Sequence, residues 1–346
     1  MIRPRLMATA LAIMLGACTG GTTDNVTPAP SAPGTEPQAE PTRIAVVLPP
    51  AGTASDEAVG DLRAGISRIA AAAGVGDGLR VVQPDGPEFV ADVATVLAAD
   101  GYRLVCVLGA AALDEVAAAA AAFPGTRFCI DADRAIETTG NIWAPRPRYG
   151  EASWLVGVTA ALLGGDVVGV IVREGEPALN AKRPALVAGH RAVLAAADPG
   201  AEPVAPVVGT IASNDQAVSP VVEAVLSQEP TVLVVDVGSL GGEVLELLAD
   251  QAPSTTIIQW IDGFQEVTGP PGSVVVLRDR LAVFRLALEA LLDGTFTQLP
   301  ETIGVAEGIH SIRPARADDD IPVLAELDTW VEAVLRGEVD LGAAGP

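Results

Sequence analysis

Short apolar segments alternate with helical patterns from residue 43 almost to the end of the chain, and this alternation restricts the fold more than any other feature. Along 56–73 the apolar side chains recur every three or four residues, so they share one face of a helix. Continuous apolar strands separated by helices indicate a parallel sheet covered on both faces. The first series predicts strands at 44–48, 79–83, 103–108 and 126–130, and helices near 56–73, 88–100 and 111–122.

A second series of the same kind begins near residue 148, so we predict an α/β protein with two doubly wound parallel sheets in two lobes. Two lobes also suit the length of 346 residues. The second series predicts strands at 167–172, 204–209, 232–237, 256–261 and 274–277, and helices near 148–163, 183–197, 216–228, 242–250, 281–292 and 323–336. Ligands of such folds bind at the carboxyl ends of strands, which here are followed by loops at 49–56, 109–112, 131–133, 238–242, 262–265 and 278–280.

The chain is strongly acidic, with 21 Lys and Arg against 44 Asp and Glu and a formal net charge of −23. Phosphate binding needs a basic surface, so this charge argues against a nucleic-acid partner. It also argues against adsorption to anionic lipid through a basic face. Lys182 is the only lysine, and we interpret the excess of arginine as the codon bias of a GC-rich genome.

Residues 1–17 have the features of a lipoprotein signal peptide. Arg3 and Arg5 precede a run of ten apolar residues, which is too short to span a bilayer at about 20 residues per helix. The sequence LGAC at 15–18 resembles a bacterial lipobox, in which Cys18 is diacylated and becomes the first residue; two acyl chains anchor a protein firmly. Residues 18–42 then form the lipidated cysteine and a disordered, proline-rich tether. An ordinary secretory signal with a chance cysteine is the alternative.

Cys106 and Cys129 each lie within an apolar run that is typical of a strand. Export would place them in an oxidising compartment, where they can pair if the two strands are level neighbours. Two buried free thiols are the other possibility. With three Cys and two His in the chain, a metal centre with Cys or His ligands is nearly excluded.

Several segments in the middle of the chain are similar to the basic membrane protein (BMP) family, the purine nucleoside receptor A-like lipoproteins. Members of this family are the substrate-binding components of ABC importers. The similarity extends over about 43–340, and the order and spacing of its motifs are more specific than any one of them. The motifs are GYRLV at 101–105, FPGTRF at 123–128 with Asp131, Asn141-Ile142, EASWLVGVTAAL at 151–162, AGHRA at 188–192 with Asp198-Pro199, IDGFQ at 261–265 and LLDGTF at 291–296.

This resemblance implies a type I periplasmic-binding-protein fold, with two α/β lobes, three crossovers and a nucleoside in the cleft. The crossovers are expected near 141–148, 262–272 and 295–310. Lobe I would take 43–142 and about 264–300, including the helix at 281–292. Lobe II would take 143–263 and about 301–346, including the C-terminal helix.

Carrying the family's ligand residues onto this chain gives both matches and departures. Asp262 matches the family's ribose-binding aspartate, and a turn cap at a strand end is its other interpretation. Arg280 stands where the family has a ribose-binding lysine, and a surface pair with Asp279 or Asp262 is its other interpretation. In the first loop the stacking phenylalanine becomes Ala58 and the family's acidic pair becomes Ala54-Ser55, with Asp56 close by. Losing one ring–base stack costs about 1–3 kcal/mol.

Other candidates lie in the predicted strand-end loops or near the junction of the lobes. Asp131 either lines the cleft or caps the next segment, and the amides around Ser239 either hold a polar group or form a plain strand–helix turn. Trp143, Trp260 and Phe264 are the aromatic residues nearest the predicted cleft, and packing beneath a hinge is the alternative interpretation of Trp143. The candidate ligand-binding residues are therefore Ser55, Asp56, Asp131, Trp143, Ser239, Asp262, Phe264 and Arg280.

Enzyme motifs such as GxSxG and HExxH are absent from the sequence, and we expect neither catalysis nor a cofactor. His190 and His310 are expected to be structural. The leading hypothesis is a lipid-anchored solute-binding protein on the extracytoplasmic face of the cell membrane. It would capture a small polar, nucleoside-like solute and deliver it to an ABC permease and its ATPase. The alternative is a sensor or interaction lipoprotein whose cleft has weakened.

Overall fold

The computed structural model describes residues 42–109, 112–132, 136, 140–174, 179–200, 205–212, 217–261 and 269–341, with the backbone alone at 179–181 and 239. Residues 41–346 form one compact unit. The predicted signal peptide, Cys18 and the tether up to residue 41 lie outside the described residues. None of the helices in the described part has both the length and the hydropathy needed to cross a membrane.

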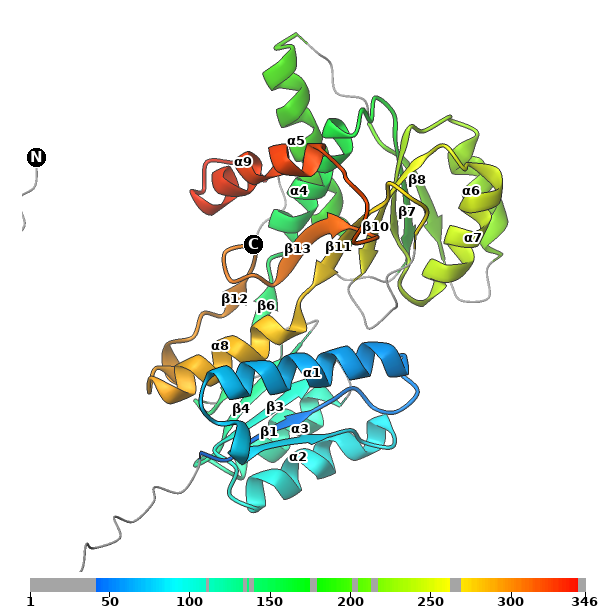
Figure 1. Ribbon diagram of the computed structural model, residues 1–346. Helices are drawn as coiled ribbons and strands as arrows, with labels where there is room; N and C mark the ends of the chain where they lie inside the picture. The colour runs from blue at the N-terminus through cyan, green and yellow to red at the C-terminus, as the bar shows by residue number, and fades with distance from the viewer. Residues whose placement is uncertain are drawn as a thin grey trace, which may run out of the picture. The chain divides into compact units, whose positions relative to one another are not determined.

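The first lobe is built on a sheet of five parallel strands in the order β2-β1-β3-β4-β5. Helices α1 and α8 cover one face, where Figure 1 shows them side by side, and helices α2 and α3 cover the other. Its elements are β1 (Ile44–Val47), α1 (Asp56–Ala72), β2 (Leu79–Val82), α2 (Val90–Ala99), β3 (Leu104–Leu108), α3 (Leu113–Ala121), β4 (Arg127–Asp131), β5 (Ile142–Trp143) and α8 (Arg280–Leu292).

The second lobe has a six-stranded sheet in the order β13-β11-β10-β9-β7-β8, parallel except for β13. Helices α4 and α5 lie on one face and α6 and α7 on the other, while α9 packs against α4 and α5 (Figure 1). Its elements are α4 (Tyr149–Leu162), β7 (Val168–Arg173), α5 (Leu179–Ala197), β8 (Val207–Ile211), α6 (Val218–Leu226), β9 (Val232–Asp236), α7 (Gly241–Gln251), β10 (Thr256–Ile261), β11 (Val274–Arg278), β13 (His310–Pro314) and α9 (Val323–Leu335).

Three crossovers connect the lobes. The first and third run together as β6 (Arg146–Pro147) and β12 (Thr302–Ile303), which pair in parallel. The second is only one residue long, because Arg278 ends a strand of the second sheet and Arg280 begins a helix of the first lobe. Strand β11 therefore belongs to the second lobe, whereas the range 264–300 expected for lobe I includes it. Its register against β10 and β13 is what places it there.

Cys106 and Cys129 form a disulfide between adjacent parallel strands. The two residues are level in the register of β3 and β4, and their Cα atoms are 4.5 Å apart. Both are fully buried in the core under α1 and α8. The structure thus decides between the two possibilities that the sequence left open.

Helices α4 and α5 pack so closely that two glycines are required where they touch. A Cβ atom added at Gly157 would overlap the carbonyl oxygen of Leu186, and one at Gly189 would overlap the carbonyl oxygen of Trp154. Because backbone atoms cannot move aside cheaply, Gly157→Ala should destabilise the protein by about 1–3 kcal/mol in urea unfolding.

Gly60 in α1 is the matched control, because a Cβ there meets no heavy atom within 4 Å. Gly60→Ala should be neutral or stabilising by up to about 1 kcal/mol, since alanine is the better helix former. Equal urea midpoints for the two variants would show that α4 and α5 accommodate the added Cβ at residue 157 without a loss of stability.

Candidate functional site

A cluster of charged and aromatic side chains lies where strands of both sheets end. Asp131, Asp236 and Arg278 are the last residues of β4, β9 and β11, and Trp260 is the last but one of β10. This is the edge at which doubly wound sheets bind ligands. We call the following residues the carboxyl-edge cluster: Asp131, Tyr149, Lys182, Asp236, Trp260, Arg278, Arg280 and His310.

Asp131 of the first lobe pairs with two arginines, of which Arg278 ends a strand of the second lobe and Arg280 begins a helix of the first. One carboxylate oxygen accepts from Nη2 of Arg278 and the other from Nη1 of Arg280. Arg278 also donates to the carbonyl of Ala132 at 2.9 Å and to the hydroxyl of Tyr149 at 3.2 Å. The side chains of Asp131 and Arg278 are 0% and 1% exposed, so this network is shielded from water.

Burial lowers the pKa of Arg280 to about 10, because desolvation disfavours the charged form. The guanidinium still carries its proton at neutral pH. Arg278 and Arg280 flank the one-residue crossover, so Asp131 is bonded to the chain on both sides of that hinge point.

Lys182 forms the other end of the cluster, on the second lobe. Its Nζ lies 2.7 Å from Oδ2 of Asp236, with both side chains less than a tenth exposed. The same ammonium lies 4.5 Å from the ring centroid of Trp260 and 5.1 Å from that of Tyr149. His310 completes the aromatic group, with its ring 5.6 Å from Tyr149 and 5.9 Å from Trp260.

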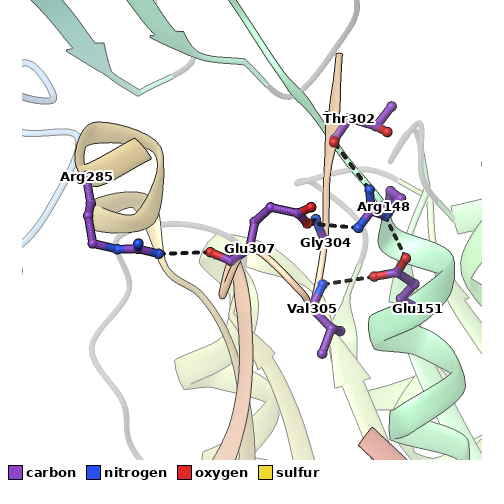
Figure 2. Close-up of polar contacts among 7 residues, drawn as sticks. All are labelled: Arg148, Glu151, Arg285, Thr302, Gly304, Val305 and Glu307. Carbon is purple, nitrogen blue, oxygen red and sulfur yellow. Dashed lines mark hydrogen bonds and ion pairs between the residues drawn. The ribbon is translucent and has the colours of Figure 1, made fainter. Parts of the chain in front are cut away.

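A second polar network joins the three crossovers, and Glu307 is at its centre (Figure 2). One of its carboxylate oxygens accepts from Arg148 at 2.8 Å and from the amide of Gly304 at 2.6 Å. Its backbone carbonyl accepts from Arg285 of α8 at 3.1 Å. Because Arg148 follows the first crossover and α8 follows the second, Glu307 ties the third crossover to both.

Replacing Glu307 by glutamine should lower the free energy of unfolding by about 1–2 kcal/mol. The variant keeps the size of the side chain but loses the charge that Arg148 contacts in a partly buried position. The matched control is Glu332→Gln, which removes a carboxylate from an exposed pair with Arg336 and should change the urea midpoint little. Similar midpoints for both variants would contradict a central role for Glu307.

Of the eight candidate residues, the structure brings Asp131 and Arg280 together. Arg280 is buried against Asp131 rather than lying at the surface. Asp279, one of the two aspartates considered as its surface partner, caps α8 by accepting from the amide of Leu281 at 2.9 Å. Asp262 and Phe264 lie outside the described residues.

The first-loop candidates have local contacts in this structure. Ser55 is the N-cap of α1, where its hydroxyl accepts from the amide of Ala58 at 3.2 Å, and Asp56 lies in the first turn of the same helix. Both are exposed. An acidic residue in the first turn of a helix is favourable by itself, so neither residue needs a ligand to explain it.

Trp143 packs beneath the crossovers, as one of its two interpretations predicted. It belongs to the core of the first lobe, and its indole nitrogen donates to the carbonyl of Pro300 at 2.8 Å. A cavity of about 550 Å³ adjoins it, lined also by Phe296, Arg146 and Glu301. For Ser239 the structure describes the backbone alone, which forms a short turn between β9 and α7.

Most of the cluster is absent from the candidates chosen on sequence. The position of Asp236 and Arg278 at the ends of apolar strands could have identified both as candidates. Lys182 could have been identified because it is the only lysine in the sequence. Tyr149 had no signal of this kind. His310 is the first residue of β13, and it is buried against two aromatic rings.

No protein-family model matches this chain, and no curated protein matches it in sequence. Solved structures do match. A solute-binding protein of an ABC transporter system from Conexibacter woesei has a TM-score of 0.61 at 19% identity, over 88% of this chain and all of the other. A solute-binding protein from Aeropyrum pernix has a TM-score of 0.59 at 16% identity, over 86% and 92%. A transcriptional activator of the comK gene from Bacillus halodurans has a TM-score of 0.60 at 16% identity, over 86% and 98%.

At these identities the comparisons show the fold. Together with the two sheets and the crossovers, they confirm the type I periplasmic-binding-protein fold that was expected from the sequence. The same fold serves a protein described as a transcriptional activator. The choice among functions therefore depends on the site.

Proposed function

We propose that this chain is an extracytoplasmic solute-binding protein that captures a small polar solute at the carboxyl-edge cluster and passes it to an ABC permease with its ATPase. The observation that carries the proposal is the buried network from Asp131 through Arg278 to Tyr149. It joins both lobes at the strand ends, where this fold binds ligands. Closure of two lobes about a hinge is the motion by which such proteins hold a solute.

Attachment to the membrane through a diacylated Cys18 belongs to the same proposal. The buried disulfide between Cys106 and Cys129 supports an oxidising compartment outside the cytoplasm. Replacing Cys18 by serine should release the protein from the membrane fraction, and labelling with radioactive palmitate should disappear from the variant. Labelling that persists in the variant would exclude Cys18 as the lipidated residue.

For the solute, a nucleoside is the class that the family resemblance implies. The family's stacking phenylalanine is Ala58 here, so a base needs another ring, and Trp260 and Tyr149 provide two in the cluster. We expect isothermal calorimetry of residues 41–346, a compact unit by themselves, to show binding of a purine or pyrimidine nucleoside. Trp260→Ala should weaken that binding about ten- to a hundredfold. No heat with any nucleoside would reject this solute class.

A sensor or interaction protein is the second candidate. The observation that favours it is that charged groups of the carboxyl-edge cluster already have partners within the protein. In this structure the cations of the cluster contact the protein's own carboxylates and rings. Neighbouring genes discriminate between the two functions: adjacent permease and ATPase genes support transport, whereas an adjacent kinase gene supports sensing.

A further inference from the structure

The ammonium of Lys182 is enclosed by groups that recognise cations. It has the faces of Trp260 and Tyr149 at 4.5 and 5.1 Å and the Asp236 carboxylate at 2.7 Å. Two aromatic faces and a carboxylate are the combination that proteins use to bind ammonium groups. We call Tyr149, Asp236 and Trp260 the ammonium cage.

The cage belongs entirely to the second lobe. Tyr149 begins α4, Asp236 ends β9, and Trp260 lies near the end of β10. Opening or closing of the hinge therefore leaves the three groups in place relative to one another. The cage is a preformed feature at the edge where this fold binds solutes.

The identity of the residue in the cage is informative as well. Codon bias explains why lysine is rare in this chain, but it does not explain why the one lysine lies here. A guanidinium is a broad planar fork, whereas an ammonium is a compact point charge. The cage thus selects a compact cation in a chain that uses arginine for every other basic residue.

The cage also has a hydrogen-bond donor without a partner among the described residues. The indole Nε1–H of Trp260 is buried and donates to none of them, and the residue is only 5% exposed. A cavity of about 20 Å³, about the size that holds one water, adjoins Trp260, Lys182, Asp236 and Ser153. An oxygen acceptor next to a bound ammonium would satisfy this donor.

We propose that the cage is the subsite for a primary ammonium of the solute and that Lys182 fills it as a tethered cation until the solute displaces it. The solute class is a cationic amine with a neighbouring oxygen, such as an amino sugar or an amino alcohol. This inference rests on the proposed solute-binding function and names a solute class other than the nucleoside that the family resemblance implies. The net charge of −23 attracts such cations.

The single lysine makes displacement directly observable. Protein labelled with ¹³C-lysine gives signals from Lys182 alone, and the two rings should shift its Cε protons upfield when no solute is present. Adding glucosamine or ethanolamine should move these signals to the positions of a solvated lysine. Glucose and ethylene glycol, which lack the amine, should leave them unchanged. Signals that no amine moves at millimolar concentration would overturn the proposal.

Two variants test the cage from opposite directions. Lys182→Met removes the tethered competitor, so calorimetry should show glucosamine binding about tenfold or more tighter than in the wild type. Asp236→Asn removes the carboxylate and should weaken glucosamine binding about tenfold or more. Thermal melting of both variants checks that they fold, and weaker glucosamine binding by folded Lys182→Met would contradict displacement.

The experiment separates this inference from the function on which it rests. If a nucleoside binds and no amine moves the Lys182 signals, solute binding stands and the ammonium subsite is rejected. If neither class of solute binds and the Lys182 signals remain ring-shifted throughout, both are rejected.

Discussion

Replacing Asp131 by asparagine should lower the free energy of unfolding by about 3–5 kcal/mol and abolish solute binding at the carboxyl-edge cluster. The amide has the shape of the carboxylate but lacks the charge that Arg278 and Arg280 share. With the side chain of Asp131 fully buried, water cannot replace that charge, and breaking a buried pair from one side has a cost of this size.

Urea unfolding monitored by circular dichroism measures the loss of stability, and calorimetry measures binding. The control is Asp61→Asn, which removes one negative charge from an exposed position on α1. It should leave both measurements close to the wild type. If Asp131→Asn unfolds at the same urea concentration as the control, the contacts with the two arginines contribute nothing to the folded state.

The periodicity of the sequence predicted the long elements because burial repeats along them. Strand β9 is buried at every position, and α1 buries one face at the expected spacing. Strands β5, β6 and β12 are only two residues long, so they have no period to detect. Strand β13 joins its sheet antiparallel and half exposed, so it lacks the continuous apolar run that is typical of a buried parallel strand.

The site was harder to predict, because it depends on contacts between residues far apart in the sequence. Asp131 and Arg280 could each be placed at a strand end or helix start, but their pairing spans 149 positions. Ser55 shows the opposite case. A serine before a helix in a ligand loop suits a binding role, yet the nearby amide of Ala58 is its partner. A cap is local, and the helix start at Asp56 already predicts it.

The placement of Lys182 shows how far composition alone can be interpreted. A single lysine among 21 basic residues is expected from codon bias, and nothing in the sequence separates a surface lysine from a buried one. Asp236 lies 54 positions away, and the two aromatic rings come from the start of another helix and from another strand. Only the folded chain shows that the rare residue occupies a matched environment.

Reduction of the Cys106–Cys129 disulfide should lower the free energy of unfolding by about 3 kcal/mol, the expected loss of a crosslink between residues 23 positions apart. Both cysteines are fully buried, so the reductant should act only when the protein unfolds.

The measurement compares urea unfolding with and without dithiothreitol, and mass spectrometry confirms the two thiols. The double variant Cys106→Ala, Cys129→Ala is the control, because dithiothreitol should not change its urea midpoint. If the wild type also shows no shift, the crosslink does not stabilise the fold. A shift of the expected size would mean that the chain reaches full stability only where disulfides form, which matches the proposed location outside the cytoplasm.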